Sequence, residues 1–157
     1  MKRLTLVLLS ALLLPRGATA QQQAVADSIR RQADRFIAAL ASKDIDQFVS
    51  LFTTSPDFIY VDAGNIYPDP PALRKAGAGF FSRIKTFNAK WDPEKIVVLG
   101  PDGGAFTGVL KVDATDTADK PIWPLGKIWT LVYQRRAGKW QIIQAHEANI
   151  PPPRKAG

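Results

Sequence analysis

Two places in this sequence combine residue types that can carry a proton. His146 is the only histidine among the 157 residues, and the Glu147 carboxylate follows it directly in "QAHEA". Asp62 ends the apolar run "DFIYVD" and stands just before "AGN". A carboxylate or an imidazole in a closed pocket can act as a general acid or base. The competing interpretations are an ordinary half-buried histidine and an aspartate that only caps a turn.

Strand alternation separates His146 from Glu147. In a strand that starts at Trp140, successive side chains point to opposite faces. One face carries Trp140, Ile142, Gln144, His146 and Ala148, and the other carries Gln141, Ile143, Ala145, Glu147 and Asn149. The two residues therefore cannot act as a side-by-side pair. Which face lines a pocket stays open, because a slip of one residue at a bulge would exchange the faces.

Other kinds of site find little support. One His, no Cys and only two Glu, at positions 94 and 147, leave no metal cluster of usable spacing, and we expect no cofactor. "GAGFFS" is a glycine pair within a helical pattern, so it is not a phosphate loop. No Ser lies in a nucleophile-elbow sequence. The strand aromatics either line a pocket for an apolar ligand or simply pack in the core.

The elements that must position these residues begin with helices. Apolar residues recur at helical spacing from Ala24 to Ser42, which predicts an amphipathic helix. Asp44 is a suitable N-cap for a second, short helix over "IDQFVSLF". "DFIYVD" predicts a strand, with "AGNIYPDPP" as turn and loop. Asp69 can cap a third helix that carries apolar residues to the core as far as Ile84.

The second half of the chain has the pattern of strands. They are expected around "FNAKW", "EKIVVLG", "GGAFTGVLKVDAT", "GKIWTLVYQ" and "KWQIIQAHEA". "GPDGG" and "RRAG" predict hairpin turns, whereas "DTADKPIWP" is a longer loop. Helices followed by an antiparallel sheet indicate an α+β domain.

The first 20 residues have the pattern of a secretory signal peptide. Basic Lys2 and Arg3 precede an apolar run from Leu4 to Leu14, and small residues lead to Ala20, where we expect cleavage. The apolar run is too short to cross a bilayer, which takes about 20 residues. We therefore expect a secreted or periplasmic protein with no membrane attachment after cleavage.

The remaining 137 residues are enough for one domain, 21–150, followed by a mobile tail, 151–157. Without Lys2, Arg3 and Arg16 the formal charge falls from +7 to +4, and the other basic residues form no continuous stripe. Nucleic acid is therefore not an expected partner. Since there is no Cys, packing or oligomerisation must stabilise the fold.

"SKDIDQFVSLF" and "RRAGKWQIIQAH" are the most specific pieces of this pattern. Together with the element order, they make nearly the whole mature chain resemble the nuclear transport factor 2-like superfamily, and within it the SnoaL-like proteins. The resemblance implies a cone-shaped α+β fold, also called cystatin-like, in which a curved antiparallel sheet wraps the long helix around an apolar pocket. Members commonly pair through the outer face of the sheet, so a homodimer is expected.

Ketosteroid isomerase shares this fold and provides a catalytic template, in which a carboxylate moves a proton and two donors hold the enolate. Carried over by the resemblance, the catalytic aspartate falls on Asp62. The donor tyrosine falls on Phe36 and the protonated acid falls near Thr130, so both donors are missing. Losing one such donor costs about two to three powers of ten in rate. Steroid isomerisation is therefore disfavoured, and the same register would put Glu147 in the pocket and His146 outside.

These observations predict a pocket for a small, mostly apolar molecule. Its expected lining is Tyr60, Trp91, Trp123, Trp129, Thr130 and Glu147, and the candidate catalytic residues are Asp62 and His146. One hypothesis is a binding protein, because the oxyanion donors are missing. Another is a cofactor-independent isomerase, cyclase or dehydratase with Asp62 or His146 as proton carrier. A third is a module whose role is oligomerisation.

Overall fold

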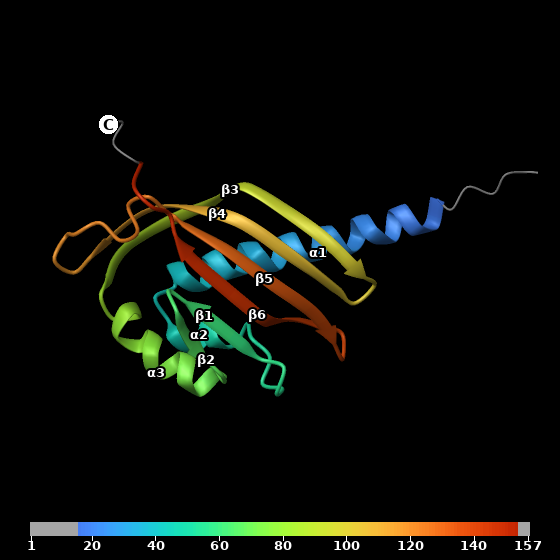
Figure 1. The fold of residues 1–157 in the computed structure, drawn as a ribbon, viewed down its shortest axis with the longest axis horizontal. Coiled ribbons are helices and arrows are strands. Elements are labelled where there is room, and N and C mark those ends of the chain that lie inside the picture. Colours follow the sequence, from blue (N-terminus) through green and yellow to red (C-terminus); the bar gives the residue numbers. More distant parts are fainter. Residues whose placement is uncertain (1–15, 154–157) are drawn as a thin grey trace, which may run out of the picture.

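Helices precede most of a six-stranded sheet, as the periodicity predicts (Figure 1). The structure is a computed structural model and describes residues 16–153. Its elements are α1 (Arg16–Ala41), α2 (Ile45–Val49), β1 (Ile59–Asp62), β2 (Asn65–Tyr67), α3 (Pro70–Phe81), β3 (Ile84–Gly100), β4 (Gly103–Asp116), β5 (Lys127–Arg136) and β6 (Lys139–Asn149). Most of the predicted signal peptide and the last four residues of the predicted tail lie outside the described residues.

The helices form where capping and apolar spacing place them. Ile29, Ala33 and Phe36 repeat along one side of α1 and are fully buried. Asp44 caps α2 by accepting hydrogen bonds from two backbone amides, and Asp69 caps α3 by accepting one. Helix α1 begins earlier than predicted and runs through the expected cleavage position. None of the helices in the described part of the chain is long and apolar enough to cross a membrane.

The strands form one sheet in the order β2-β1-β6-β5-β4-β3. Neighbouring strands are antiparallel, with the exception of β1, which runs parallel to β6. The four long strands bend around α1, while α2, α3, β1 and β2 gather at one end (Figure 1). This arrangement is the predicted cone-shaped α+β fold.

Two predictions about the strands are wrong. The segment after Asp62 is not only turn and loop, because Ala63 and Gly64 form a two-residue turn with positive φ and the chain returns as β2. The strands predicted around "FNAKW" and "EKIVVLG" are one strand, β3, with an irregularity between Trp91 and Glu94. Its proline is tolerated because β3 lies at the sheet edge. The third helix is also shorter than predicted, because α3 ends at Phe81 and Ile84 begins β3.

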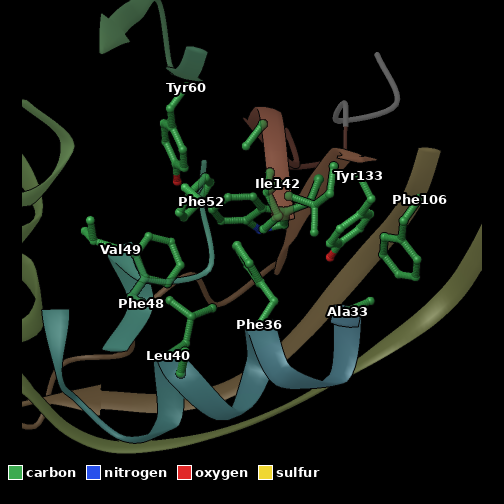
Figure 2. Close-up of a cluster of buried hydrophobic side chains, with 14 of the residues drawn as sticks. Ala33, Phe36, Leu40, Phe48, Val49, Phe52, Tyr60, Phe106, Tyr133 and Ile142 are labelled. Atoms are coloured by element: carbon green, nitrogen blue, oxygen red, sulfur yellow. The ribbon is translucent and has the colours of Figure 1, made fainter. Parts of the chain in front are cut away.

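An aromatic core joins the helices to the concave face of the sheet. Figure 2 shows Phe36 and Leu40 pointing from α1 toward Phe48 and Phe52. The Phe36 ring meets Phe48 at 5.1 Å and Trp129 at 4.8 Å between ring centroids, both edge to face. Most of the large aromatic residues are therefore used in packing the cone, and only some remain for a pocket.

A bulge in β6 changes which side chains face the core. The β5–β6 pairing passes from Tyr133↔Ile142 to Val132↔Gln144, so Ile143 is the extra residue. Ile142 before the bulge and Ala145 after it are both buried, although simple alternation puts them on opposite faces. Simple alternation therefore fails across the bulge, because Ile142 lies on the same buried side as Ala145 and Glu147. It holds after the bulge, where Glu147 is buried and His146 is exposed.

Candidate functional site

Three adjacent strands bring Asp62, Lys127 and Glu147 together on the concave face of the sheet. Asp62 ends β1, Lys127 begins β5, and Glu147 lies near the end of β6, which runs between them. The parallel ladder sets Asp62 opposite Glu147, and the antiparallel ladder sets Glu147 opposite Trp129, two residues from Lys127. Side chains at such positions are neighbours on one face of a sheet.

Lys127 bridges the two carboxyl groups. Its Nζ lies 2.6 Å from Glu147 Oε1 and 3.4 Å from Asp62 Oδ1. The side chains of Lys127 and Glu147 are only 6% and 4% exposed, whereas that of Asp62 is 31% exposed. Lys and Glu are almost never buried unless paired. The buried contact between Lys127 and Glu147 is therefore a specific part of the fold, and Asp62 lies on its more exposed side.

The loop between β4 and β5 completes the surroundings of Lys127. Trp123 in this loop has a φ of 46°, rare for a bulky residue, and it stacks on Phe80 at 4.9 Å. The Lys127 ammonium lies 4.8 Å from the centroid of the Trp123 ring, which provides a cation–π contact. Gly126 has a φ of 79°, and a Cβ there would lie 2.4 Å from the Leu110 carbonyl oxygen. Glycine at this position is what lets the chain enter β5 with Lys127 facing inward.

The two carboxyl groups are driven to different protonation states. Burial, and then a hydrogen bond with Asp62, raise the pKa of Glu147 to about 8, against the opposing influence of the Lys127 charge. Burial also disfavours the charge of Asp62. There the hydrogen bond from Glu147 and the charge of Lys127 outweigh burial, so the pKa of Asp62 is lowered. The environment therefore favours the protonated form of Glu147 and the ionised form of Asp62.

Tyr60 holds the other oxygen of Glu147. Its hydroxyl donates a hydrogen bond of 3.1 Å to Glu147 Oε2, and the residue is 5% exposed. Burial, and then the neighbouring Glu147 charge, raise the pKa of Tyr60 well above its ordinary range. The phenol therefore stays protonated and fixes the orientation of the Glu147 carboxyl group.

A cavity of about 170 Å³ opens onto this cluster. Its lining is mainly apolar and aromatic, with the polar groups of the cluster at one side. The lining residues are Leu40, Ile45, Phe48, Tyr60, Asp62, Tyr67, Leu73, Ala76, Gly77, Phe80, Phe81, Trp123, Lys127, Trp129 and Glu147. An apolar pocket with a few converging polar groups is the usual form of a small-molecule site.

Four of the residues predicted to bind a ligand line this cavity, namely Tyr60, Trp123, Trp129 and Glu147, and so does the candidate Asp62. The structure places the other three elsewhere.

Trp91 packs between α1 and β4, where its Nε1 donates to the Ala33 carbonyl oxygen at 3.1 Å. Thr130 lies on the outer face of β5, and its hydroxyl is 3.2 Å from that of Thr107. His146 is exposed opposite Thr130, because alternation after the bulge turns it away from Glu147. The structure therefore does not bring His146 and Asp62 together.

Lys127 is the member of the site that the sequence reasoning missed. A signal was present, because alternation in "GKIWTLVYQ" puts Lys127 on the same face as Trp129, Leu131 and Tyr133, all of which are buried. A lysine on a core-facing side indicates a buried partner. That partner is 20 residues away in the sequence, so the pattern alone does not identify it.

The arrangement has the elements of acid–base chemistry. Asp62, whose pKa is lowered, and Glu147, whose pKa is raised, lie beside one apolar space, and such a difference is what assigns a base and an acid. Phe36 is buried in the core, as predicted. It has no hydroxyl, so it cannot replace the donor tyrosine of the isomerase template. Within the described residues, no group of three or more His, Cys, Asp or Glu side chains is arranged to hold a metal ion.

Comparison with known proteins agrees with this architecture. The sequence pattern of the SnoaL-like domain matches residues 29–151. No curated protein matches the sequence significantly.

Solved structures of similar fold include a protein named "Putative Scytalone Dehydratase" from Novosphingobium aromaticivorans, with a TM-score of 0.71, 12% identity, and coverage of 85% of this chain and 89% of that one. A hexachlorocyclohexane dehydrochlorinase of type 2 has a TM-score of 0.65 at 13% identity, covering 88% and 97%. An uncharacterised cystatin-like protein from Caulobacter vibrioides has a TM-score of 0.66 at 19% identity, covering 80% and 89%. At these identities the likeness establishes the fold alone.

Proposed function

Since the chain belongs to the SnoaL-like domain family, within the nuclear transport factor 2-like fold, we propose that its cavity binds a small, mostly apolar molecule and catalyses proton transfer on it. The reaction class is a cofactor-independent elimination, such as a dehydration. The observation that carries this proposal is that two carboxyl groups, Asp62 and Glu147, are joined by Lys127 beside one cavity, in surroundings that shift their pKa values in opposite directions.

Asp62 is the general base of the reaction. Its lowered pKa favours the ionised form, it lines the cavity, and its side chain is more exposed than those of Lys127 and Glu147. In a β-hydroxy ketone it takes the proton from the carbon next to the carbonyl, and the electrons of that C–H bond form a C=C bond. A positioned general base contributes about 10²–10⁴-fold to the rate.

Glu147 is the general acid. Its proton goes to the departing hydroxyl, the C–O bond breaks with its electron pair on oxygen, and water leaves. Asp62 then holds a proton and Glu147 is ionised. Their direct hydrogen bond lets this proton pass back to Glu147, so the starting state is restored without an external carrier.

Lys127 and Tyr60 support this cycle. When Glu147 becomes negative, the Lys127 ammonium at 2.6 Å and the Tyr60 hydroxyl at 3.1 Å stabilise the new charge. Both donors are already in place before the reaction, so no reorganisation is needed. The names of two structural relatives, a dehydrochlorinase and a scytalone dehydratase, describe eliminations and support the same reaction class.

The test is elimination of water from 3-hydroxycyclohexanone, followed as the ultraviolet absorbance of the enone. We expect Asp62→Asn to lower the rate by about 10²–10⁴-fold. Asp57→Asn is the matched control, because Asp57 is an exposed carboxylate, paired with Arg136, that is absent from the cavity lining.

No elimination by the unaltered protein, or equal rates for Asp62→Asn and Asp57→Asn, would overturn the enzyme proposal. A ligand that binds in the cavity without turnover would then favour the binding-protein hypothesis. Phe36 supports that hypothesis, because it occupies the place of the donor tyrosine in the isomerase template.

Two further parts of this proposal concern the whole protein. We propose that it acts as a secreted or periplasmic protein after removal of residues 1–20, which N-terminal sequencing of the exported chain would test. We also propose a homodimer formed through the outer face of the sheet, where Ile128 is 39% exposed. Large apolar side chains exposed on one face of a sheet are typical of interaction surfaces.

A further inference from the structure

The size of the cavity limits what can enter it. At about 170 Å³ it is close to an engineered protein cavity of about 150 Å³ that binds benzene. Its walls are already in contact with one another, since Phe80 stacks on Trp123 and Phe81 packs against Phe48 at 5.2 Å. A fused polycyclic molecule would fit wholly within the cavity only if these rings separated.

The charges of the cavity are balanced within the protein. The Lys127 ammonium is held between Asp62 and Glu147, and its remaining side faces the Trp123 ring. The surrounding wall is aromatic and aliphatic. An anion would find the ammonium already occupied, and a cation would compete with it for the carboxylates. A charged ligand would therefore lose its hydration without gaining a free counter-charge.

Gly77 determines the width of the cavity where α3 meets α2. A Cβ at this position would lie 2.8 Å from Ile45 Cδ1 and 3.9 Å from Phe81 Cδ2, and all three residues line the cavity. A contact of 2.8 Å forces the flexible end of Ile45 to move. Gly79 lies on the same helix with no atom within 4 Å of an added Cβ. The close contact that an added Cβ would make at Gly77 is thus specific to this position and is not a general property of α3.

We propose that the cavity takes a neutral molecule the size of a single six-membered ring, and that Gly77 is the residue that sets this limit. The inference rests on the proposed function only in locating the substrate at this site. It goes further by naming the substrate class and the specificity-determining residue.

The test is binding, measured by isothermal titration calorimetry on the full mature chain with a graded set of probes. Benzyl alcohol is the neutral one-ring probe, 2-naphthalenemethanol adds a fused ring, androstenedione is a steroid, and benzoate is the charged one-ring probe. The variants are Gly77→Ala and Gly79→Ala. Both substitutions add the same helix propensity, so a difference between them reports on the cavity.

We expect the unaltered protein to bind benzyl alcohol at least tenfold more tightly than each of the other three probes. Gly77→Ala should weaken benzyl alcohol binding at least tenfold, whereas Gly79→Ala should leave it unchanged. The inference is overturned if 2-naphthalenemethanol, androstenedione or benzoate binds as tightly as benzyl alcohol. It is also overturned if no probe binds, or if the two glycine variants behave alike.

This outcome is separable from that of the elimination assay. Binding needs no proton transfer, so the expected probe order without any turnover would refute the proposed function and leave the size limit standing. Turnover of a polycyclic ketone that depends on Asp62 would support the proposed function and refute the size limit. Circular dichroism of Gly77→Ala checks that the helices are retained, and competition by benzyl alcohol in the elimination assay gives a second measure of its affinity.

Discussion

The protonated state of Glu147 makes the stability of this protein depend on pH in an unusual direction. The pKa of Glu147 rises from its ordinary value of 4.5 to about 8 on folding. Between these values the folded chain holds a proton that the unfolded chain has lost. The free energy of unfolding therefore falls as pH rises, and the contribution of Glu147 is fully present only below about pH 4.5.

The size of the effect follows from the shift. One pKa unit corresponds to about 1.4 kcal/mol, so the free energy of unfolding should fall by roughly 1.4 kcal/mol per pH unit from about pH 5 to pH 8. The total is about 4–5 kcal/mol, a large part of the roughly 5–15 kcal/mol typical of a folded domain. Asp62 does not oppose this trend in the same window. Its pKa is lowered, so its contribution is lost only as the solution becomes more acidic than its ordinary pKa of 3.8.

Urea unfolding followed by tryptophan fluorescence at pH 5, 6, 7 and 8 would measure this slope. Glu147→Gln is the matched variant, because the amide has nearly the same shape, its carbonyl oxygen can still accept from Lys127, and it carries no titrating proton.

We expect a falling profile for Glu147 and a much flatter one for Glu147→Gln. A flat or rising profile with Glu147 intact would refute the reasoning, as would equal slopes in the two proteins. Either result would mean that Glu147 is ionised in the folded state and that Lys127, at 2.6 Å, outweighs burial.

Three more predictions concern the lysine of the site, the cap of α2 and the outer face of the sheet. Lys127→Met should lower the free energy of unfolding, by up to about 3–5 kcal/mol, because it removes the counter-charge of Asp62 and a hydrogen-bond donor to Glu147; an unchanged free energy would contradict this account. Asp44→Ala removes the N-cap of α2 and should cost about 1 kcal/mol in urea unfolding, and no loss would show that the cap is dispensable. Light scattering should give the mass of a dimer, and Ile128→Lys should give a monomer; a monomeric parent protein would refute the proposed interface.

Much of the fold could be predicted because its signals are local. The apolar spacing of α1, the caps Asp44 and Asp69, and the turn between β5 and β6 each depend on a few neighbouring residues. β2 was missed because its turn, Ala63–Gly64, begins with an alanine, which does not usually indicate positive φ.

The candidate site was only partly predictable, since its contacts join distant parts of the chain. Asp62 was identified from its place at a strand end, and Glu147 from the register that the family resemblance implies. Lys127 was not identified, because its partners are 65 and 20 residues away. Strand alternation could have indicated that Lys127 lies on a buried face, but it could not have identified the partners of Lys127.

By itself, the sequence determined that this chain makes its helices before most of its strands, that His146 and Glu147 point to opposite faces, and that Asp62 ends a strand. Helical spacing, capping and the two-residue period of a strand act over a few residues, so they can be deduced from the order of the amino acids. Only the tertiary structure decided that Asp62, Lys127 and Glu147 meet, and that burial raises the pKa of Glu147. Burial and charge pairing depend on which strands become neighbours, and here that required β1 to pair in parallel with the last strand of the chain.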